Sequence, residues 1–203
     1  SAEAAEGARY DFSELKHITN PVWGNSIQLF TEGTIKDEKD TAITSSSTLR
    51  YKWQLDGMDL TGYSNAAHAI ATNVAAIDLS KDAVGKNLSV RFYENGKDDV
   101  TITTINLGTV QAKSLTGVTM SFGDGGAGFA YTGQATDAQK VPTMVTGLPT
   151  GIDKDDFDWS WSGCDGSKVG TVTVTGTLKA DKAEATGYAG TITGEYKIVK
   201  QTN

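Results

Sequence analysis

The chain has 203 residues, with 25 acidic and 18 basic side chains and a formal net charge of −7. This acidic balance lacks the basic footprint through which proteins bind phosphates, so we expect no nucleic-acid partner. No apolar run approaches the ~18 residues of a membrane helix, so we expect no membrane insertion in this segment.

Composition favours β structure: Thr, Val, Ile and aromatic residues occur in short runs, with 23 glycines and only 3 prolines. The single cysteine, Cys164, rules out an intrachain disulfide. It leaves open a cytosolic protein or a secreted protein that does without disulfides. The chain starts at Ser1 without an initiator Met, so we expect a fragment of a longer protein, with any targeting signal outside it.

The N-terminal third is predicted to hold few regular elements. Residues 1–9 are small and polar and are expected to be a linker. Ile27 and Leu29 share one face of a predicted strand. Residues 36–48 are predicted to be a solvated loop, because lysines interleave with the acids and the ligand spacing of a calcium loop is absent.

The clearest strand of the first half is residues 51–57 (YKWQLDG). Tyr51, Trp53 and Leu55 alternate with polar residues, which predicts one buried and one solvated face. Asp56-Gly57 supplies a turn where the run stops. We therefore predict Trp53 to be a core anchor.

Further along, residues 75–79 and 88–93 are predicted strands. Asn95-Gly96 predicts a hairpin, and its returning strand runs to Val110. A new β pattern begins at Leu115, so the boundary is placed in residues 111–114. The predicted domains are residues 10–112 and 113–203.

The second half repeats this organisation. A glycine-dense turn at residues 123–128 lacks the Lys-Ser/Thr step and the helix of a phosphate-binding loop. Residues 157–163 (FDWSWSG) form a second tryptophan strand, followed by strands at 171–175 and 191–199 and a turn of helix within 179–186. At least five short strands per half predict an all-β chain of two tandem β-sandwiches.

The first half resembles an immunoglobulin-like domain of bacterial surface proteins. The resemblance covers about residues 20–112, and the two cysteines of antibody domains are absent. The residues that carry it are 51–57 (YKWQLDG), 60–62 (LTG), 76–79 (AIDL) and 83–90 (AVGKNLSV).

The second half is similar to a repeat of long surface proteins of Gram-positive bacteria. The order and spacing of its motifs carry this likeness. They are 131–133 (YTG), 141–142 (VP), 156–161 (DFDWSW), 170–176 (GTVTVTG), 188–193 (YAGTIT) and 196–198 (YKI).

The two resemblances imply tandem Ig-like domains in an extracellular protein of the bacterial cell surface or cell wall. They imply a non-catalytic structural spacer, with neighbouring domains of the same polypeptide as partners. Two alternatives stay open: an adhesin module that binds carbohydrate or a host protein, and a phage virion decoration domain.

Four tryptophans are the candidate site residues. Trp53 and Trp159 are predicted core anchors, since alternating aromatics usually fill a core. Trp23, close to a proline, and Trp161, the second aromatic of its strand, are predicted to contact a ligand if an aromatic platform exists.

Other chemistry is expected to be absent. Lys154 interrupts the acidic run at residues 153–158, so no metal is expected. The sequence lacks a nucleophile elbow, a nucleotide fingerprint and metal-spaced histidines, so we expect no enzyme and no cofactor. A Lys–Asn isopeptide crosslink is a minor alternative for Lys52, Lys86 and Lys197.

Overall fold

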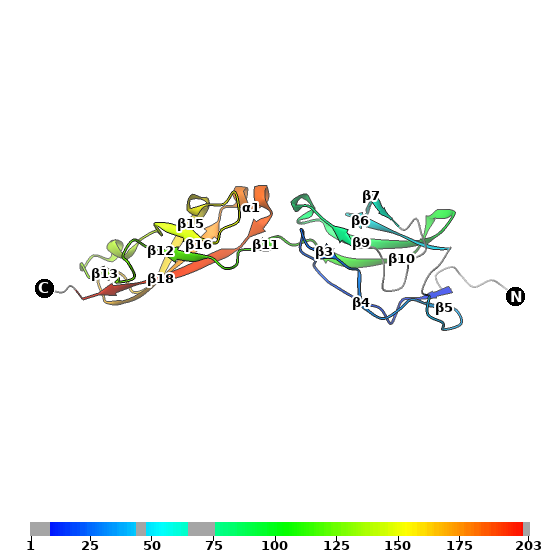
Figure 1. Ribbon diagram of the computed structural model, residues 1–203, viewed down its shortest axis with the longest axis horizontal. Helices are drawn as coiled ribbons and strands as arrows, with labels where there is room; N and C mark the ends of the chain where they lie inside the picture. The colour runs from blue at the N-terminus through cyan, green and yellow to red at the C-terminus, as the bar shows by residue number, and fades with distance from the viewer. Residues whose placement is uncertain (1–8, 44–47, 65–75, 201–203) are drawn as a thin grey trace. The chain divides into compact units, whose positions relative to one another are not determined.

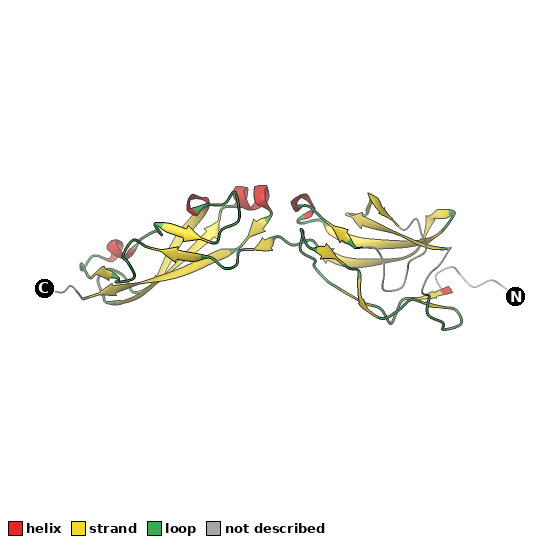
Figure 2. Cartoon of the chain, viewed as in Figure 1, coloured by secondary structure: helices red, strands yellow, loops and turns green. Residues whose placement is uncertain are grey.

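The computed structural model describes residues 9–43, 48–64 and 76–200 (Figure 1). These residues are mostly β strand with one short α-helix, so the predicted all-β class is confirmed (Figure 2). The chain divides into two compact units, residues 1–112 and 113–203, at the same position as the predicted boundary. Each unit has its own sheets and its own core.

The first unit, unit 1, consists of strands and one 3-10 helix in its described part. They are β1 (Tyr10–Asp11), β2 (Lys16–His17), β3 (Ser26–Ile27), β4 (Phe30–Glu32), β5 (Lys36–Asp37), β6 (Leu49–Leu55), β7 (Met58–Ser64), β8 (Ile77–Asp78), η2 (Lys81–Ala83), β9 (Asn87–Glu94) and β10 (Lys97–Thr109).

Strand β6 lies inside an antiparallel sheet of unit 1 whose order is β10-β9-β6-β7. The turn that joins β6 to β7 has positive φ at both Asp56 (+48°) and Gly57 (+77°). Two positive φ angles define a type I′ turn, whose twist matches that of the flanking strands. The alternation of β6 thus ends where the sequence provides the residues that this turn requires.

The core of unit 1 lies between this sheet and a layer of short strands. Trp53 and Phe92 come from the sheet, and Leu29, Ile35 and Ile77 come from β3, β4, β8 and the chain beside them. These five side chains are all completely buried, at 0% exposure. In Figure 1 the short blue strands lie along one side of the cyan and green sheet.

Three expectations for unit 1 need correction or lie outside the described part. Residues 36–48 were expected to be a loop, but Lys36–Asp37 form β5, which pairs with β1. Arg9 was expected in the linker, but its guanidinium donates to the buried Glu94 carboxylate at 2.7 Å. The first residue of the predicted strand at 75–79 lies outside the described residues, and Ile77–Asp78 of that range form β8.

The second unit, unit 2, is built from shorter elements around one four-stranded sheet. Its elements are β11 (Lys113–Ser114), β12 (Thr119–Ser121), β13 (Phe129–Ala130), η3 (Ala135–Ala138), β14 (Met144–Thr146), η4 (Lys154–Asp156), β15 (Phe157–Gly163), β16 (Gly170–Leu178), α1 (Ala180–Thr186), β17 (Tyr188–Ala189) and β18 (Thr191–Val199).

The sheet of unit 2 has the order β13-β18-β16-β15, so β15 is an edge strand (Figure 1). The pair β12–β14 packs over it, because the Met120 side chain lies against Gly194 of β18. The core divides into two small clusters, one around Val174 and Tyr196 and one around Phe157 and Ile192. Trp159 and Met120 contact both clusters.

Helix α1 occupies the segment where the sequence predicted a turn of helix. Its residues are mostly Ala, Lys and Glu, which have high helix propensity. It ends at Gly187, whose φ of +75° gives the left-handed C-cap that glycine adopts without steric cost. The helix therefore begins and ends within the predicted range.

Candidate functional site

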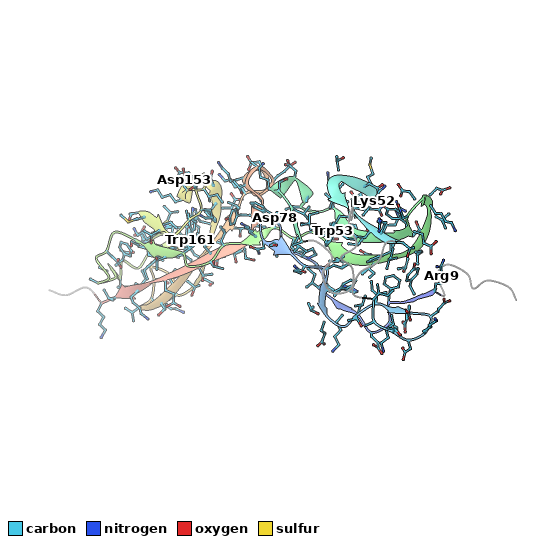
Figure 3. All side chains as sticks on the ribbon, turned by 45° about the vertical axis from the view of Figure 1, so that its right-hand side comes forward. Arg9, Lys52, Trp53, Asp78, Asp153 and Trp161 are labelled. Atoms are coloured by element: carbon cyan, nitrogen blue, oxygen red, sulfur yellow. The ribbon has the colours of Figure 1, made fainter. Side chains whose placement is uncertain are left out.

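The four tryptophans have different environments, and each unit contains two of them. Trp53 and Trp23 belong to unit 1, and Trp159 and Trp161 belong to unit 2 (Figure 3 labels Trp53 and Trp161). Trp53 is completely buried, whereas Trp23 is half-buried and packs against the edge of the same core. Trp23 is thus a core-flanking side chain and not a bare surface platform.

Trp159, the other predicted core anchor, is only half-buried. Its ring lies on Gly176, the residue directly opposite it on β16. A Cβ at Gly176 would approach Cζ3 of the indole to 2.6 Å. The missing side chain of Gly176 therefore makes room for the Trp159 ring. This cross-strand relation was not visible in the sequence, where Gly176 only ended a run.

Trp161 lines a depression of about 210 Å³ at the end of β15. Gln139, Cys164 and Asp165 also line it. The indole N–H donates to the Lys140 carbonyl at 2.8 Å, so the polar edge of the ring already has a partner within the fold. An aromatic wall beside an amide and a carboxylate can contact a sugar ring, but only through the remaining exposed part of the indole.

Lys140 contacts three aromatic side chains of unit 2: Trp161, Tyr196 and Phe129. Its backbone N–H donates to the Tyr196 hydroxyl at 3.1 Å, and its Nζ lies 5.2 Å from the Phe129 ring centroid. Burial raises the pKa of the Tyr196 phenol above its ordinary value, and the Lys140 N–H opposes that rise. The phenol therefore stays protonated at neutral pH and acts as a structural hydrogen-bonding group.

A depression of about 450 Å³ in unit 2 lies between β12, β18 and the glycine-dense turn. Met120, Tyr196 and Lys197 are among its lining residues. The Asp124 carboxylate accepts hydrogen bonds from the N–H groups of Gly126 (3.1 Å) and Gly128 (2.9 Å). These bonds close the turn on itself and take up backbone donors that an anion would need.

Unit 1 carries a compact charge network on the outer face of its sheet. Asp98 pairs with Lys52 and with Arg91 (2.5 Å), and Asp59 lies 3.6 Å from Lys52 Nζ and 3.8 Å from Arg91. Both cations also lie over the Tyr93 ring, at 5.2 and 4.9 Å from its centroid. Four charges from β6, β7, β9 and β10 thus tie the four strands together.

This network bears on the isopeptide alternative for Lys52. The hydrogen bond to Asp98 raises the pKa of the Lys52 ammonium, and the bonds from Lys52 and Arg91 lower the pKa of the Asp98 carboxyl. An amide bond forms by attack of an uncharged amine on a carboxamide or neutral acid. The network favours the charged forms of both groups and so works against that reaction.

The acidic run of the second tryptophan strand has a structural role. Asp153 caps the 3-10 helix η4 by accepting the Asp155 N–H at 2.8 Å, and Asp156 accepts the Asp153 N–H at 2.9 Å. Lys182 lies 3.5 Å from Asp156. Among the described residues, no group of three or more His, Cys, Asp or Glu side chains is placed to hold a metal ion.

The remaining polar candidates stand apart from one another. His17 contacts the Ile18 carbonyl at the surface, and His68 lies outside the described residues. Cys164 is a free, half-buried thiol. Within the part of the chain that the structure describes, no helix has the length and apolar character needed to span a membrane.

A feature that the sequence did not predict is the parallel pairing of an early segment with a late segment within each unit. In unit 1, the Gln111 N–H donates to the Pro21 carbonyl (2.8 Å) and the Trp23 N–H donates to the Gln111 carbonyl (3.4 Å). These two bonds flank a parallel bridge between the beginning and the end of the unit. No local signal marks such a pair, because the partners are about ninety residues apart.

Unit 2 has the same kind of pairing. Strand β11 lies parallel to β17, and β13 lies parallel to β18. The Lys113 N–H donates to the Gly187 carbonyl (2.9 Å), and the Tyr131 N–H donates to the Val199 carbonyl (2.7 Å). Parallel pairs thus connect an early segment with a late segment in both units, and in unit 2 the first strand, β11, and the last strand, β18, each have a parallel partner.

Comparison of the chain with protein families, with curated proteins and with solved structures finds no match in any of the three. The resemblance to bacterial surface-protein domains therefore stays a prediction.

Proposed function

We propose that this chain is a structural spacer: two Ig-like β-sandwich modules of a larger bacterial surface protein that transmit tension along the polypeptide. The observation that carries the proposal is the parallel pairing of an early segment with a late segment in both units. Support also comes from the separate core of each unit, which lets each module stand as an independent link in a chain.

The direction of the terminal strands determines how a pulling force reaches the hydrogen bonds. In a parallel pair, the N-terminal end of one strand and the C-terminal end of the other lie at opposite ends of the ladder. Tension that enters such a pair through its terminal strand, β11 or β18 in unit 2, slides the two strands past each other, and the ladder bonds resist together. An antiparallel terminal pair would be opened one bond at a time.

The experiment is single-molecule stretching of the full chain, tethered by its two ends. Tyr131→Pro removes the N–H that donates to Val199 at the end of the parallel β13–β18 pair of unit 2, which contains the last strand of the unit. The Tyr131 side chain is 43% exposed, so its loss disturbs little packing. We expect the unfolding force of unit 2 to fall, while unit 1 unfolds at the same force as before.

A matched control separates force geometry from stability. Thr143→Pro removes the N–H and the hydroxyl that donate to the Ser121 carbonyl at 2.8 and 3.2 Å, beside the antiparallel β12–β14 pair. Tyr131→Pro should lower the free energy of unfolding by about 0.5–1.5 kcal/mol in denaturant, and Thr143→Pro by at least as much. Only Tyr131→Pro should lower the unfolding force. Equal losses of force in both variants would contradict the idea that the parallel β13–β18 pair resists the pulling force.

A second candidate function is adhesion through the Trp161 depression. The observation that favours it is the half-exposed indole beside Gln139 and Asp165. A glycan array and an array of host matrix proteins, probed with the full chain, test this function directly. Binding that disappears in Gln139→Ala, with the fold intact by circular dichroism, would support the adhesin over the spacer.

A further inference from the structure

The outer edge of β15 carries a row of backbone groups that no strand pairs within the described part of the chain. β15 is last in its sheet, and its neighbour β16 covers only one side. At one end of the pair the Cys164 N–H donates to the Thr171 carbonyl (2.9 Å), and at the other the Lys179 N–H donates to the Asp156 carbonyl (2.9 Å). Both bonds involve an even-numbered residue on the β15 side.

The register then determines which residues face outward. Hydrogen-bonded pairs alternate along an antiparallel ladder. The even-numbered residues Asp158, Ser160 and Ser162 therefore bond β16. The odd-numbered residues, Trp159 and Trp161 at the centre of the strand, direct their N–H and C=O groups away from the sheet.

Natural proteins usually protect such an edge. Bulges, lysines and prolines on edge strands discourage pairing with another chain. In unit 1 the edge strands follow this pattern, because the pairing of β10 has three register shifts and that of β7 has one. The β15–β16 register is unbroken over seven residue pairs, and residues 157–163 contain neither lysine nor proline.

We propose that β15 is a self-association surface, on which β15 of a second copy of this chain adds as an antiparallel strand. A two-fold axis at Ser160 pairs each residue with its complement: Ser160 with itself, Trp159 with Trp161 of the second copy, and Asp158 with Ser162. Every outward backbone group on residues 157, 159, 161 and 163 then meets a partner. The interface is isologous and closed.

The charge and the aromatic side chains of β15 favour a second copy of the same strand as its partner. The only charged side chain of the strand, Asp158, faces a serine hydroxyl and not its own copy. On the inner face, the half-exposed Trp159 and Trp161 of the two copies lie opposite each other as aromatic cross-strand pairs. Pairing covers two large rings that the single chain leaves partly in water.

The first experiment measures the mass of the full chain by sedimentation equilibrium from micromolar to millimolar concentration. We expect a monomer–dimer equilibrium, accompanied by a blue shift of tryptophan emission as the dimer forms. Ser160→Lys places two ammonium groups face to face on the axis and should weaken the dimer by at least about tenfold. Thr193→Lys adds the same charge in the same row of the same sheet face, two strands from the edge, and should leave the dimer unchanged.

The second experiment tests the register and does not depend on a charged variant that could fail to fold. In a Cys164→Ser background, Ser160→Cys should form a disulfide dimer under mild oxidation, because opposed residues of a non-hydrogen-bonded pair lie about 4.5 Å apart. Asp158→Cys should not, because its copy is about four residues away along the ladder. A chain that stays monomeric, a dimer insensitive to Ser160→Lys, or crosslinking at position 158 would each overturn the proposal.

Discussion

The two tryptophan strands, β6 and β15, share a sequence pattern but differ in their place in the sheet. Both strands are seven residues long, and apolar side chains, including two aromatic ones in β6 and three in β15, alternate with polar side chains. β6 has a neighbour on each side, and Trp53 is completely buried. β15 has one neighbour, and Trp159 and Trp161 are half-buried. Alternation therefore predicts which face of a strand is buried but not how deeply, because depth depends on partners far away in the chain.

Polar residues show the same difference. On β6 the face predicted to be solvated includes Gln54, which is only 9% exposed and donates to Asp59 at 2.8 Å. The corresponding face of β15 carries Ser160 and Ser162, which are exposed. A central strand is thus covered on both faces, while an edge strand is open on one face and along one side.

The largest expected effect is that of Trp53→Ala. Removing a fully buried indole leaves a cavity in the core of unit 1 and should cost about 3–5 kcal/mol of unfolding free energy. Denaturant unfolding of the full chain should show an early transition for unit 1, with the unit 2 transition unmoved. A loss as small as that of Trp159→Ala would remove the distinction between a central and an edge tryptophan.

Much of unit 1 and unit 2 could be predicted because the signals are local. The type I′ turn at Asp56-Gly57 and helix α1 with its glycine cap depend on residues adjacent in sequence. The strands β1, β2 and β5 were missed, because two-residue strands have no period to detect. The contacts that position Trp159 and Trp161 were also missed, since Gly176 and Lys140 are recognisable as partners only after the strands are paired.

The next largest loss of stability is expected for Gly176→Ala, which tests how the Trp159 ring packs. Gly176→Ala should destabilise unit 2 by about 1–3 kcal/mol, because the new methyl group overlaps the indole. In a Trp159→Ala background the same substitution should cost little, since the overlapping ring is gone. A double-mutant cycle by denaturant unfolding measures this coupling. If the losses of unfolding free energy in the two single variants add up in the double variant, the Trp159 ring does not need the space that Gly176 leaves.

Trp161→Phe tests whether the second aromatic of β15 serves the fold. The substitution keeps an aromatic ring but removes the N–H that donates to the Lys140 carbonyl. We expect a loss of about 0.5–1.5 kcal/mol in the unfolding free energy of unit 2. Gln139→Ala, which alters the same depression without touching this bond, is the control. Unchanged stability in Trp161→Phe would leave the indole N–H free for a ligand.

The smallest loss of stability is expected for Asp98→Asn, on the outer face of the unit 1 sheet, where ion pairs connect the strands. Asp98 is bonded by Lys52 and Arg91, but its side chain is 53% exposed, so Asp98→Asn should cost only about 0.5 kcal/mol. The pH dependence identifies the source of that energy. The pKa of Asp98 is lowered in the folded state, so its contribution is present above the ordinary aspartate pKa of about 3.9 and is lost as pH falls through the depressed value.

The pKa of Lys52 is raised, so its contribution is present below the ordinary lysine pKa of about 10.4 and is lost as pH rises through the raised value. The stability difference between the parent chain and Asp98→Asn should therefore be constant from about pH 5 to 9 and shrink at both extremes. Thermal unfolding across this range, repeated at high salt, measures it. A difference that persists in strong acid would mean that Asp98 acts through packing. Packing, and not ion pairing, would then stabilise the outer face of the unit 1 sheet, as it does the core.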